Sequence, residues 1–368
     1  MKVVFCTLFD RHYLGKGLLM IRSLRRQGGA AAPQVYVLCL DRVVLEYFQL
    51  FPEPGVELMT LEELEEADPA LLRAKRDRSR VEYYFTLSPC WPRHLLLSGE
   101  WEAVVSLDAD LYFFSDPMPL VGSLGEKPIF ITDHGYDRKV RRAGLRTGRF
   151  NISFQGFRND PVALACLDQW RRQCLEWCRS QVDERRGRFA DQRYLDRWPE
   201  DFAGSVTLLL PPGPGLAPWN VARWELSLRD GQLCAGAARL VFYHFQGLRP
   251  LGGGLVADNL WRYRVIPSRE AVAHLYGPYL RELQAAEQVI DARLGAAGPS
   301  GPPGAWRLWR AQSYFVLEGA EVRHVSLARW HPLQRCWRWV KSYFPAPSAA
   351  GVPGLRRRWA KWRRPRRA

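Results

Sequence analysis

The chain has 368 residues, of which 47% are hydrophobic and 12% aromatic, and this composition excludes a disordered protein and allows a large core. The formal charge is +15, but residues 305–368 hold 15 Lys or Arg and two Asp or Glu, a net of +13. Residues 1–304 therefore carry only +2 (15 − 13). An enzyme that acts on nucleic acid usually carries its positive charge around the active cleft, so this distribution argues against nucleic acid as the main substrate.

Short apolar runs alternate with helical patterns, in the order typical of parallel strands covered by helices. Strands are predicted over 3–9, 35–40, 56–60, 104–114 and 129–132. Helices are predicted over 17–26 and 81–97, the second interrupted by Pro89 and Pro92. Less regular elements follow over 151–157, 206–210 and 240–245, together with a long helix over 161–182. The expected fold class is α/β, with a mostly parallel sheet flanked by helices.

Two carboxylates, Asp108 and Asp110, follow the apolar run 103–107. The end of a strand in an open α/β sheet is where ligands bind. Two Asp one residue apart can offer oxygen atoms to one divalent cation, and such ligands suit Mg²⁺ or Mn²⁺. Since that cation would neutralise a diphosphate, the pattern favours an enzyme that handles a nucleoside diphosphate ester. Phosphatases of the haloacid dehalogenase type also use Asp-x-Asp, but there the motif follows the first strand.

Six ordered blocks resemble the GT-A nucleotide-diphospho-sugar transferases, and most closely the retaining galactosyl- and glucosyltransferases of glycosyltransferase family eight. The resemblance covers residues 1–265. It rests on Thr7-Leu8-Phe9-Asp10 with Tyr13, Arg80-Val81-Glu82-Tyr83, LDADLYFFSDP over 107–117, Phe150-Asn151-Ile152-Ser153, Asp191-Gln192 and His244-Phe245-Gln246-Gly247.

The resemblance implies a GT-A, Rossmann-like fold and a role for each block. It implies that Asp108, Asp110 and His244 bind Mn²⁺ or Mg²⁺, and that Asp191 and Gln192 lie near the anomeric carbon of the donor as candidate catalytic residues. The residues expected to bind the nucleotide sugar are Thr7, Leu8, Phe9, Asp10, Tyr13, Arg80, Asp108, Ala109, Asn151 and Arg249.

Two positions depart from the family pattern. Arg249-Pro250 lies one residue closer to Gly247 than the family's Lys-Pro, although Arg can also clamp phosphate oxygens. Ile152-Ser153 replaces a small residue and Gly, which predicts a reshaped sugar pocket.

Several candidate residues also have purely structural interpretations. His244 lies in an apolar run and is open to an interpretation as a packed core residue, and Asp191 to one as a helix N-cap. Asp133, before His134, either binds sugar hydroxyls or begins a turn. Trp219, before Asn220, either offers an acceptor platform or packs in the core.

The segment 295–304, GAAGPSGPPG, has the composition of a linker. It predicts a catalytic domain over 1–294 and a basic, aromatic tail over 305–368. Within the tail, Trp330, Leu333, Trp337, Val340 and Phe344 recur at helical spacing. Seven Trp among 15 cations favour a helix at an anionic membrane surface. A solvated tail and a nucleic-acid-binding tail are the alternatives.

The compartment is expected to be the cytoplasm, at the inner face of the cytoplasmic membrane. The eight cysteines form no Cys-x-x-Cys pair and lie mostly in apolar runs, which fits a reducing compartment. The first residues have no signal-peptide pattern, and no apolar stretch approaches the roughly 20 residues of a spanning helix.

The predicted function is metal-dependent transfer of a hexose from a UDP-sugar to a cell-surface glycan, such as a lipopolysaccharide, or to another lipid-linked acceptor, with retention. The enzymatic alternatives are an inverting transferase and a self-glucosylating one. A GT-A domain that only binds or scaffolds glycans is a further alternative, against which the intact Asp108, Asp110, Asp191 and His244 argue.

Overall fold

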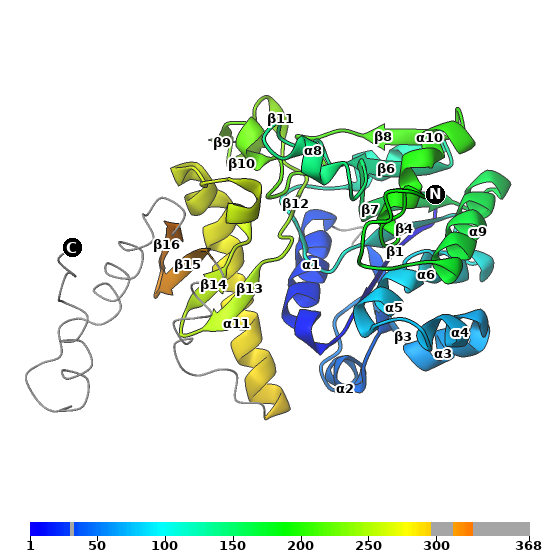
Figure 1. The fold of residues 1–368 in the computed structure, drawn as a ribbon. Coiled ribbons are helices and arrows are strands. Elements are labelled where there is room, and N and C mark those ends of the chain that lie inside the picture. Colours follow the sequence, from blue (N-terminus) through cyan, green and yellow to red (C-terminus); the bar gives the residue numbers. More distant parts are fainter. Residues whose placement is uncertain (30–32, 296–311, 327–368) are drawn as a thin grey trace, which may run out of the picture. The chain divides into compact units, whose positions relative to one another are not determined.

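The computed structural model describes residues 1–29, 33–295 and 312–326, and a seven-stranded sheet forms its centre (Figure 1). The strand order is β3-β2-β1-β4-β7-β6-β8. All neighbours are parallel except β7, which runs antiparallel to both β4 and β6. The strands are β1 (Val3–Phe9), β2 (Gln34–Cys39), β3 (Val56–Thr60), β4 (Ala103–Leu107), β6 (Ile129–Asp133), β7 (Phe150–Arg158) and β8 (Val206–Leu209). The predicted α/β class with a mostly parallel, helix-flanked sheet is confirmed.

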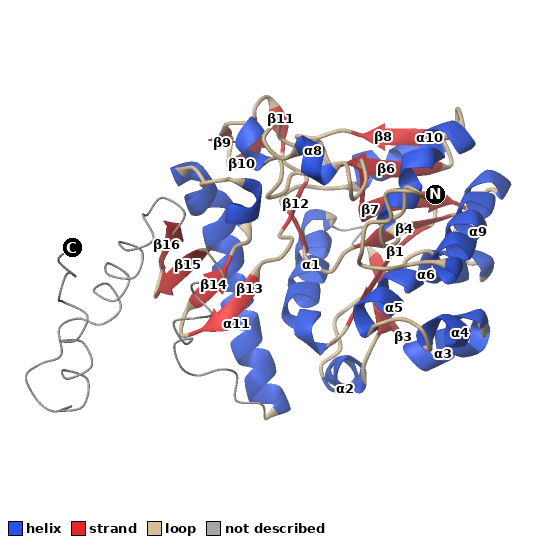
Figure 2. Ribbon diagram, viewed as in Figure 1, coloured by secondary structure: helices blue, strands red, loops and turns tan. Residues whose placement is uncertain are grey.

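Helices cover both faces of this sheet (Figure 2). Side chains alternate along β1, so that Val4 and Cys6 join one core while Phe5 and Phe9 join the other. The first core includes residues of α3 (Leu61–Ala67), α4 (Ala70–Lys75), α5 (Arg80–Leu87), α6 (Cys90–Leu97) and α9 (Pro161–Glu176). The second includes residues of α1 (Leu14–Gln27), α2 (Arg42–Leu50) and α11 (Gly277–Leu294).

One edge of the sheet collects the polar residues. The parallel strands β1, β2, β4 and β6 end at this edge, and the antiparallel β7 begins there. In the register of β6 and β7, Asn151 lies opposite Thr132. Asp10, Asp108 and Asn151 therefore stand at the carboxyl edge, where ligands bind in open α/β sheets.

Two predicted elements are longer than the structure allows. The helix expected over 161–182 ends at Glu176, because Trp177 turns into an extended conformation and its ring lies 4.6 Å from the Arg188 guanidinium. The strand expected over 104–114 is two strands, since β4 ends before Asp108 and β5 (Leu111–Phe113) leaves the sheet. The interruption predicted within 81–97 is confirmed at Pro89, which separates α5 from α6, whereas Pro92 lies inside α6.

Smaller sheets and turns complete the chain. A two-stranded sheet joins β5 to β12 (Phe242–His244), and a three-stranded sheet holds β9 (Leu226–Arg229), β10 (Gln232–Ala235) and β11 (Ala238–Arg239). The remaining helices are α7 (Met118–Val121), α8 (Arg141–Gly144) and α10 (Trp198–Asp201), with a π-helix over Ala271–Tyr276. Turns of 3₁₀ helix occupy Arg11–Tyr13, Gly122–Gly125, Gln192–Arg197, Val221–Arg223 and Leu260–Tyr263.

A four-stranded sheet extends into the segment that the sequence assigns to the tail. It is formed by β13 (Arg249–Gly252), β14 (Leu255–Ala257), β15 (Ser313–Glu318) and β16 (Glu321–Ser326). The buried Asp258 holds the hairpin, accepting from Ser313 Oγ at 2.5 Å and lying 2.7 Å from His324 Nε2. Residues 313–326 thus belong to the unit that begins at Met1. The linker at 296–304 and the expected tail helix over 329–344 lie outside the described residues.

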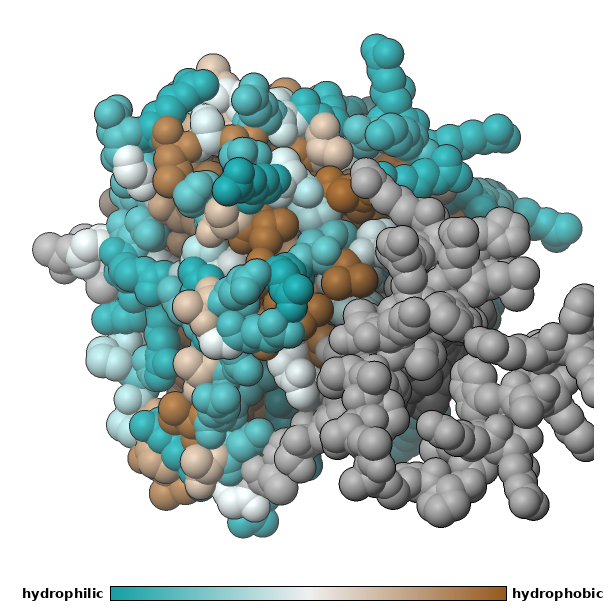
Figure 3. Space-filling model, turned by 90° about the vertical axis from the view of Figure 1, so that its left-hand side faces the viewer, coloured by the Kyte–Doolittle hydropathy of each residue, from teal (hydrophilic) through white to brown (hydrophobic). Residues whose placement is uncertain are grey.

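The face drawn in Figure 3 carries several separate hydrophobic patches among hydrophilic residues. No helix within the described ranges is long and apolar enough to cross a bilayer. The seven cysteines in these ranges are buried and free.

Candidate functional site

Asp108, Asp110 and His244 meet at the carboxyl edge because of two strand pairings. Asp108 follows β4, and its carbonyl accepts from the Leu111 N–H in a tight turn. This turn sends β5 away from the sheet, where it pairs antiparallel with β12 and aligns Leu111 with His244. The backbone N–H of Phe245 also donates to the Asp110 carbonyl at 2.9 Å. Backbone geometry therefore places the imidazole beside both carboxylates.

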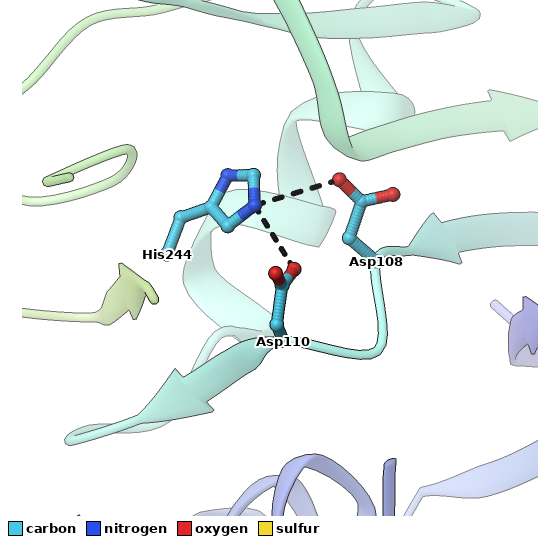
Figure 4. Close-up of side chains that lie close together, drawn as sticks. All are labelled: Asp108, Asp110 and His244. Atoms are coloured by element: carbon cyan, nitrogen blue, oxygen red, sulfur yellow. Dashed lines mark ion pairs between the residues drawn. The ribbon is translucent and has the colours of Figure 1, made fainter. Parts of the chain in front are cut away.

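The three side chains point toward one another (Figure 4). His244 Nε2 lies 3.0 Å from Asp110 Oδ1 and 3.7 Å from Asp108 Oδ2. One potential ligand atom from each residue falls within 4.8 Å of the other two. Asp110 and His244 are buried, and Asp108 is partly open to the surrounding cavity. Two carboxylate oxygens and one imidazole nitrogen form a donor set that fits Mn²⁺ or Mg²⁺, with positions left for a ligand.

The charges of the cluster are mutually dependent. Burial raises the pKa of Asp108 to about 6, assisted by Asp110 and opposed by His244. Burial also acts to raise the pKa of Asp110, but His244 and Lys16 more than offset it and hold that pKa below its ordinary value. For His244, burial lowers the pKa, yet the two carboxylates outweigh it and the net shift is upward. A proton on His244 thus occupies the place that a divalent cation would take.

Metal binding should therefore depend on pH. A metal binds the deprotonated imidazole, so we expect Mn²⁺ affinity to rise as pH increases toward the elevated pKa of His244, by up to about tenfold per pH unit. Titrating the metal-free protein with MnCl₂ at pH 6, 7 and 8 would measure this slope. The His244→Gln variant should show a weaker affinity and a shallower slope. An affinity that does not change with pH in the wild type would contradict displacement of a proton by the metal.

A cavity of about 690 Å³ surrounds the cluster. It brings together most of the residues expected to bind a nucleotide sugar, which come from β1, the turn after it, α5, the β4–β5 turn and β7. These residues are Thr7, Leu8, Phe9, Asp10, Tyr13, Arg80, Asp108, Ala109 and Asn151. Arg249, at the start of β13, is exposed and does not line the cavity.

Asp191 and Gln192 line the same cavity. Asp191 is buried and accepts a hydrogen bond from Ser88 Oγ at 2.6 Å. It precedes a 3₁₀ turn, but its side chain caps no backbone N–H of that turn. Burial raises the pKa of Asp191 to about 7, although the hydrogen bond from Ser88 opposes the rise. Gln192 Nε2 instead donates to the Thr147 carbonyl at 3.0 Å.

His134 is a buried wall of the cavity, held in its neutral form. Its Nδ1 lies 3.0 Å from the Arg149 carbonyl, which can only accept, so Nδ1 carries the hydrogen. Nε2 is then free to accept from the Asn151 amide at 3.2 Å. Burial lowers the pKa of His134 to about 3. Asp133 accepts from the Gly135 N–H at 2.7 Å and forms an ion pair with Arg149, as a turn residue does.

Aromatic rings line the cavity beside His134. Trp219 is buried and donates from Nε1 to the His134 carbonyl, while its ring meets His244 edge-on at 5.3 Å between centroids. Tyr136 stacks on His134 at 4.5 Å, and Tyr263 lies 5.9 Å from Trp219. Trp219 is therefore packed, as one of its two interpretations expected, and it also lines the cavity, while its role as an acceptor platform stays a prediction.

Several lining residues escaped the sequence analysis. Tyr136 and Tyr263 carry no local motif that marks them, and Gln246 occupies the variable position of the His-Phe-x-Gly block. Ser88 reaches Asp191 across 103 residues of sequence. The segment between β6 and β7 also lines the cavity, at Val140, Ala143, Gly144 and Thr147. Its composition gave a signal, since 138–149 contains six Lys or Arg and no Asp or Glu.

Comparison with known proteins found no matching family model. Two proteins of Bacillus subtilis (strain 168), both described as uncharacterized, are similar in sequence. YfnD is 34% identical over 287 residues, which cover 76% of this chain and 88% of that protein. YfnF is 28% identical over 257 residues, which cover 68% of this chain and 82% of that protein.

Similar solved structures include mouse xyloside xylosyltransferase 1 in its apo form, 13% identical and covering 67% of this chain and 98% of that one, with a TM-score of 0.41. They also include the galactosyltransferase LgtC in complex with donor and acceptor sugar analogues, 14% identical and covering 82% and 98% of the two chains, with a TM-score of 0.40. TM-scores below 0.5 do not establish a common fold.

Proposed function

The chain belongs to the same protein family as YfnD of Bacillus subtilis, and we propose that it is a metal-dependent GT-A glycosyltransferase. The observation that carries the proposal is the convergence of Asp108, Asp110 and His244 within 4.8 Å at the carboxyl edge of the sheet. The cavity around them is lined by the residues that the resemblance to glycosyltransferase family eight assigns to the nucleotide sugar. A glycan-binding scaffold would have no need for three buried or half-buried metal ligands inside that cavity.

We propose a UDP-hexose as the donor. A divalent cation at Asp108, Asp110 and His244, Mn²⁺ in preference to Mg²⁺ because of the imidazole, would neutralise the charge that builds on the leaving diphosphate. Thr7, Asp10 and Tyr13, on β1 and the turn that follows it, line the cavity and are proposed to bind the base and ribose.

In the proposed reaction the bond between the anomeric carbon and the diphosphate oxygen breaks, and its electron pair leaves with the phosphate. The acceptor hydroxyl oxygen forms the new bond to that carbon and gives its proton to the departing phosphate. Asp191 and Asn151, which both line the cavity, would orient the donor hydroxyls. Front-face attack with retention is the mechanism we propose, because the resemblance to the retaining transferases of glycosyltransferase family eight implies it.

The donor assignment can be tested by calorimetric titration with UDP-glucose, UDP-galactose and their N-acetyl forms, each with and without Mn²⁺. We expect one of these sugars to bind in the presence of the metal and to lose most of its affinity without it. UDP alone with Mn²⁺ is the positive control for the nucleotide. Absence of binding by every UDP compound, with and without metal, would contradict the proposal.

We further propose that residues 327–368 bind an anionic membrane and bring the enzyme to a cell-surface or lipid-linked acceptor. Eight basic residues lie between 356 and 367, interleaved with Trp359 and Trp362. Removing residues 327–368 should abolish sedimentation with vesicles that contain anionic phosphatidylglycerol, while binding of UDP with Mn²⁺ persists. Truncation after Gly304, at the end of the predicted linker, would not isolate the effect of the tail, because it also removes β15 and β16. Unchanged sedimentation of the shortened chain would refute the membrane role.

A further inference from the structure

The segment 138–149, which we name the basic rim, concentrates positive charge beside the cavity. It contains Arg138, Lys139, Arg141, Arg142, Arg146 and Arg149 and no Asp or Glu. Residues 1–304 have a net charge of +2, so without these six cations the other residues of that range have a net of −4 (2 − 6). All six side chains are exposed. The charge of the rim is therefore a local feature and does not follow from the composition of the domain.

The basic rim forms part of the cavity itself. It connects β6 to β7 and contains α8, which Figure 1 draws near β6 and β7. Val140, Ala143, Gly144 and Thr147 line the cavity, while the cations between them face solvent. A molecule that passes this wall to reach Asp108, Asp110 and His244 would thus come within range of several positive charges.

Contacts with the rest of the domain hold the rim in place. Arg146 pairs with Glu184 at 2.6 Å and Arg149 with Asp133 at 2.8 Å. Gln192 donates to the Thr147 carbonyl. Gly144 packs so closely on Tyr136 that a Cβ atom there would lie 2.6 Å from the ring. The wall is therefore built for close packing on its inner side.

Four cations of the rim take no part in these ion pairs. Arg138, Lys139, Arg141 and Arg142 have no carboxylate within ion-pair distance in the part of the chain that the structure describes. Arg262, exposed on another part of the cavity lining, is also without one in that part of the chain. Arg binds phosphate oxygens in a bidentate manner, and an exposed Lys adds a mobile point charge.

We infer that the acceptor carries a phosphate group and that the basic rim binds it. The inference rests on the proposed glycosyltransferase function, in which the cation held by Asp108, Asp110 and His244 already accommodates the donor diphosphate. The four unpaired cations of the rim are exposed and lie within two residues, in sequence, of lining residues of the cavity. They therefore suit a second anion, on the molecule that receives the sugar. The phosphate is either part of a lipid diphosphate carrier or a phosphate ester of a soluble glycan, and both present the same chemistry to the rim.

The test compares two variants that each remove four positive charges. The rim variant is R138Q/K139Q/R141Q/R142Q. The control variant, R73Q/R76Q/R229Q/R239Q, changes exposed arginines that do not line the cavity. Each protein is titrated with glucose, galactose and N-acetylglucosamine in three forms: the neutral methyl glycoside, the glycosyl phosphate and the farnesyl glycosyl diphosphate in neutral detergent micelles. UDP with Mn²⁺ is titrated in parallel to monitor the donor site.

We expect at least one phosphorylated sugar to bind the wild type and the control variant tenfold or more tightly than its methyl glycoside. In the rim variant that preference should fall at least tenfold, while UDP with Mn²⁺ binds as in the wild type. Preference for the farnesyl ester would identify a lipid-linked source, and equal binding of both phosphate forms a soluble one. The inference is overturned if no phosphorylated sugar is preferred, if the rim variant matches the control, or if it loses UDP binding equally. Failure of the wild type to bind UDP with Mn²⁺ would overturn the proposed function as well.

Discussion

Asp110→Asn should reduce metal-dependent turnover of the nucleotide sugar by roughly 10³-fold, since several kcal/mol of charge stabilisation would be lost. The substitution preserves side-chain volume and the backbone bond from Phe245 to the residue 110 carbonyl. It removes the carboxylate charge that lies 3.0 Å from His244 Nε2. The fold should therefore persist while the donor set for the metal does not.

Release of UDP from the donor, followed at saturating Mn²⁺, provides the measurement for this variant. The matched control is Asp116→Asn, because Asp116 is exposed and its Oδ1 accepts only from the Met118 N–H in the contacts described. If the turnover of Asp110→Asn stays within about threefold of the control, Asp110 does not hold a metal that turnover needs.

Asp191→Asn should lower turnover and raise stability at the same time. Burial raises the pKa of Asp191 to about 7 from an ordinary value of 3.8, so the folded state holds this proton more tightly than the unfolded state. Folding stability is then lost as pH rises from about 4 to about 7, by on the order of 4 kcal/mol for this group alone. A neutral amide avoids that loss and can still accept from Ser88.

Urea unfolding in EDTA at pH 4 and pH 8 would test the stability of this variant. We expect Asp191→Asn to exceed the wild type in free energy of unfolding at pH 8 and to match it at pH 4. Turnover at pH 8 should fall by about 10²-fold or more, as the oriented charge near the donor is lost. If the free energy of unfolding does not increase at pH 8, the pKa of Asp191 is not raised in the folded protein. That result would contradict the pH dependence expected for Asp191.

The local parts of the fold were predictable from the sequence because neighbouring residues determine them. The apolar run at 56–60 coincides with β3, and Asp108 does follow a buried strand. The grouping of Asp108 and Asp110 with His244 came from the resemblance to known transferases, since periodicity gave no reason to pair residues so far apart.

The errors have a common physical origin in contacts between distant residues. Nothing near Leu111 indicates that β5 leaves the sheet, because its partner β12 lies more than a hundred residues later. The extra length given to α9 reflects the same limit, since Trp177 is held by Arg188 from the following loop. The sequence placed residues 313–326 in the tail, but they form strands of the domain, because β14 pairs with β15.

The short pairing of β5 with β12 has a consequence for the order of events during synthesis. Asp110 and His244 are 134 residues apart (244 − 110), and the pairing that joins them involves three residues on each strand. A chain that has left the ribosome only as far as β8 already has every strand of the seven-stranded sheet and both aspartates. It still lacks His244, so a nascent fragment of this protein would not hold the complete donor set proposed for the divalent cation until translation passes residue 244.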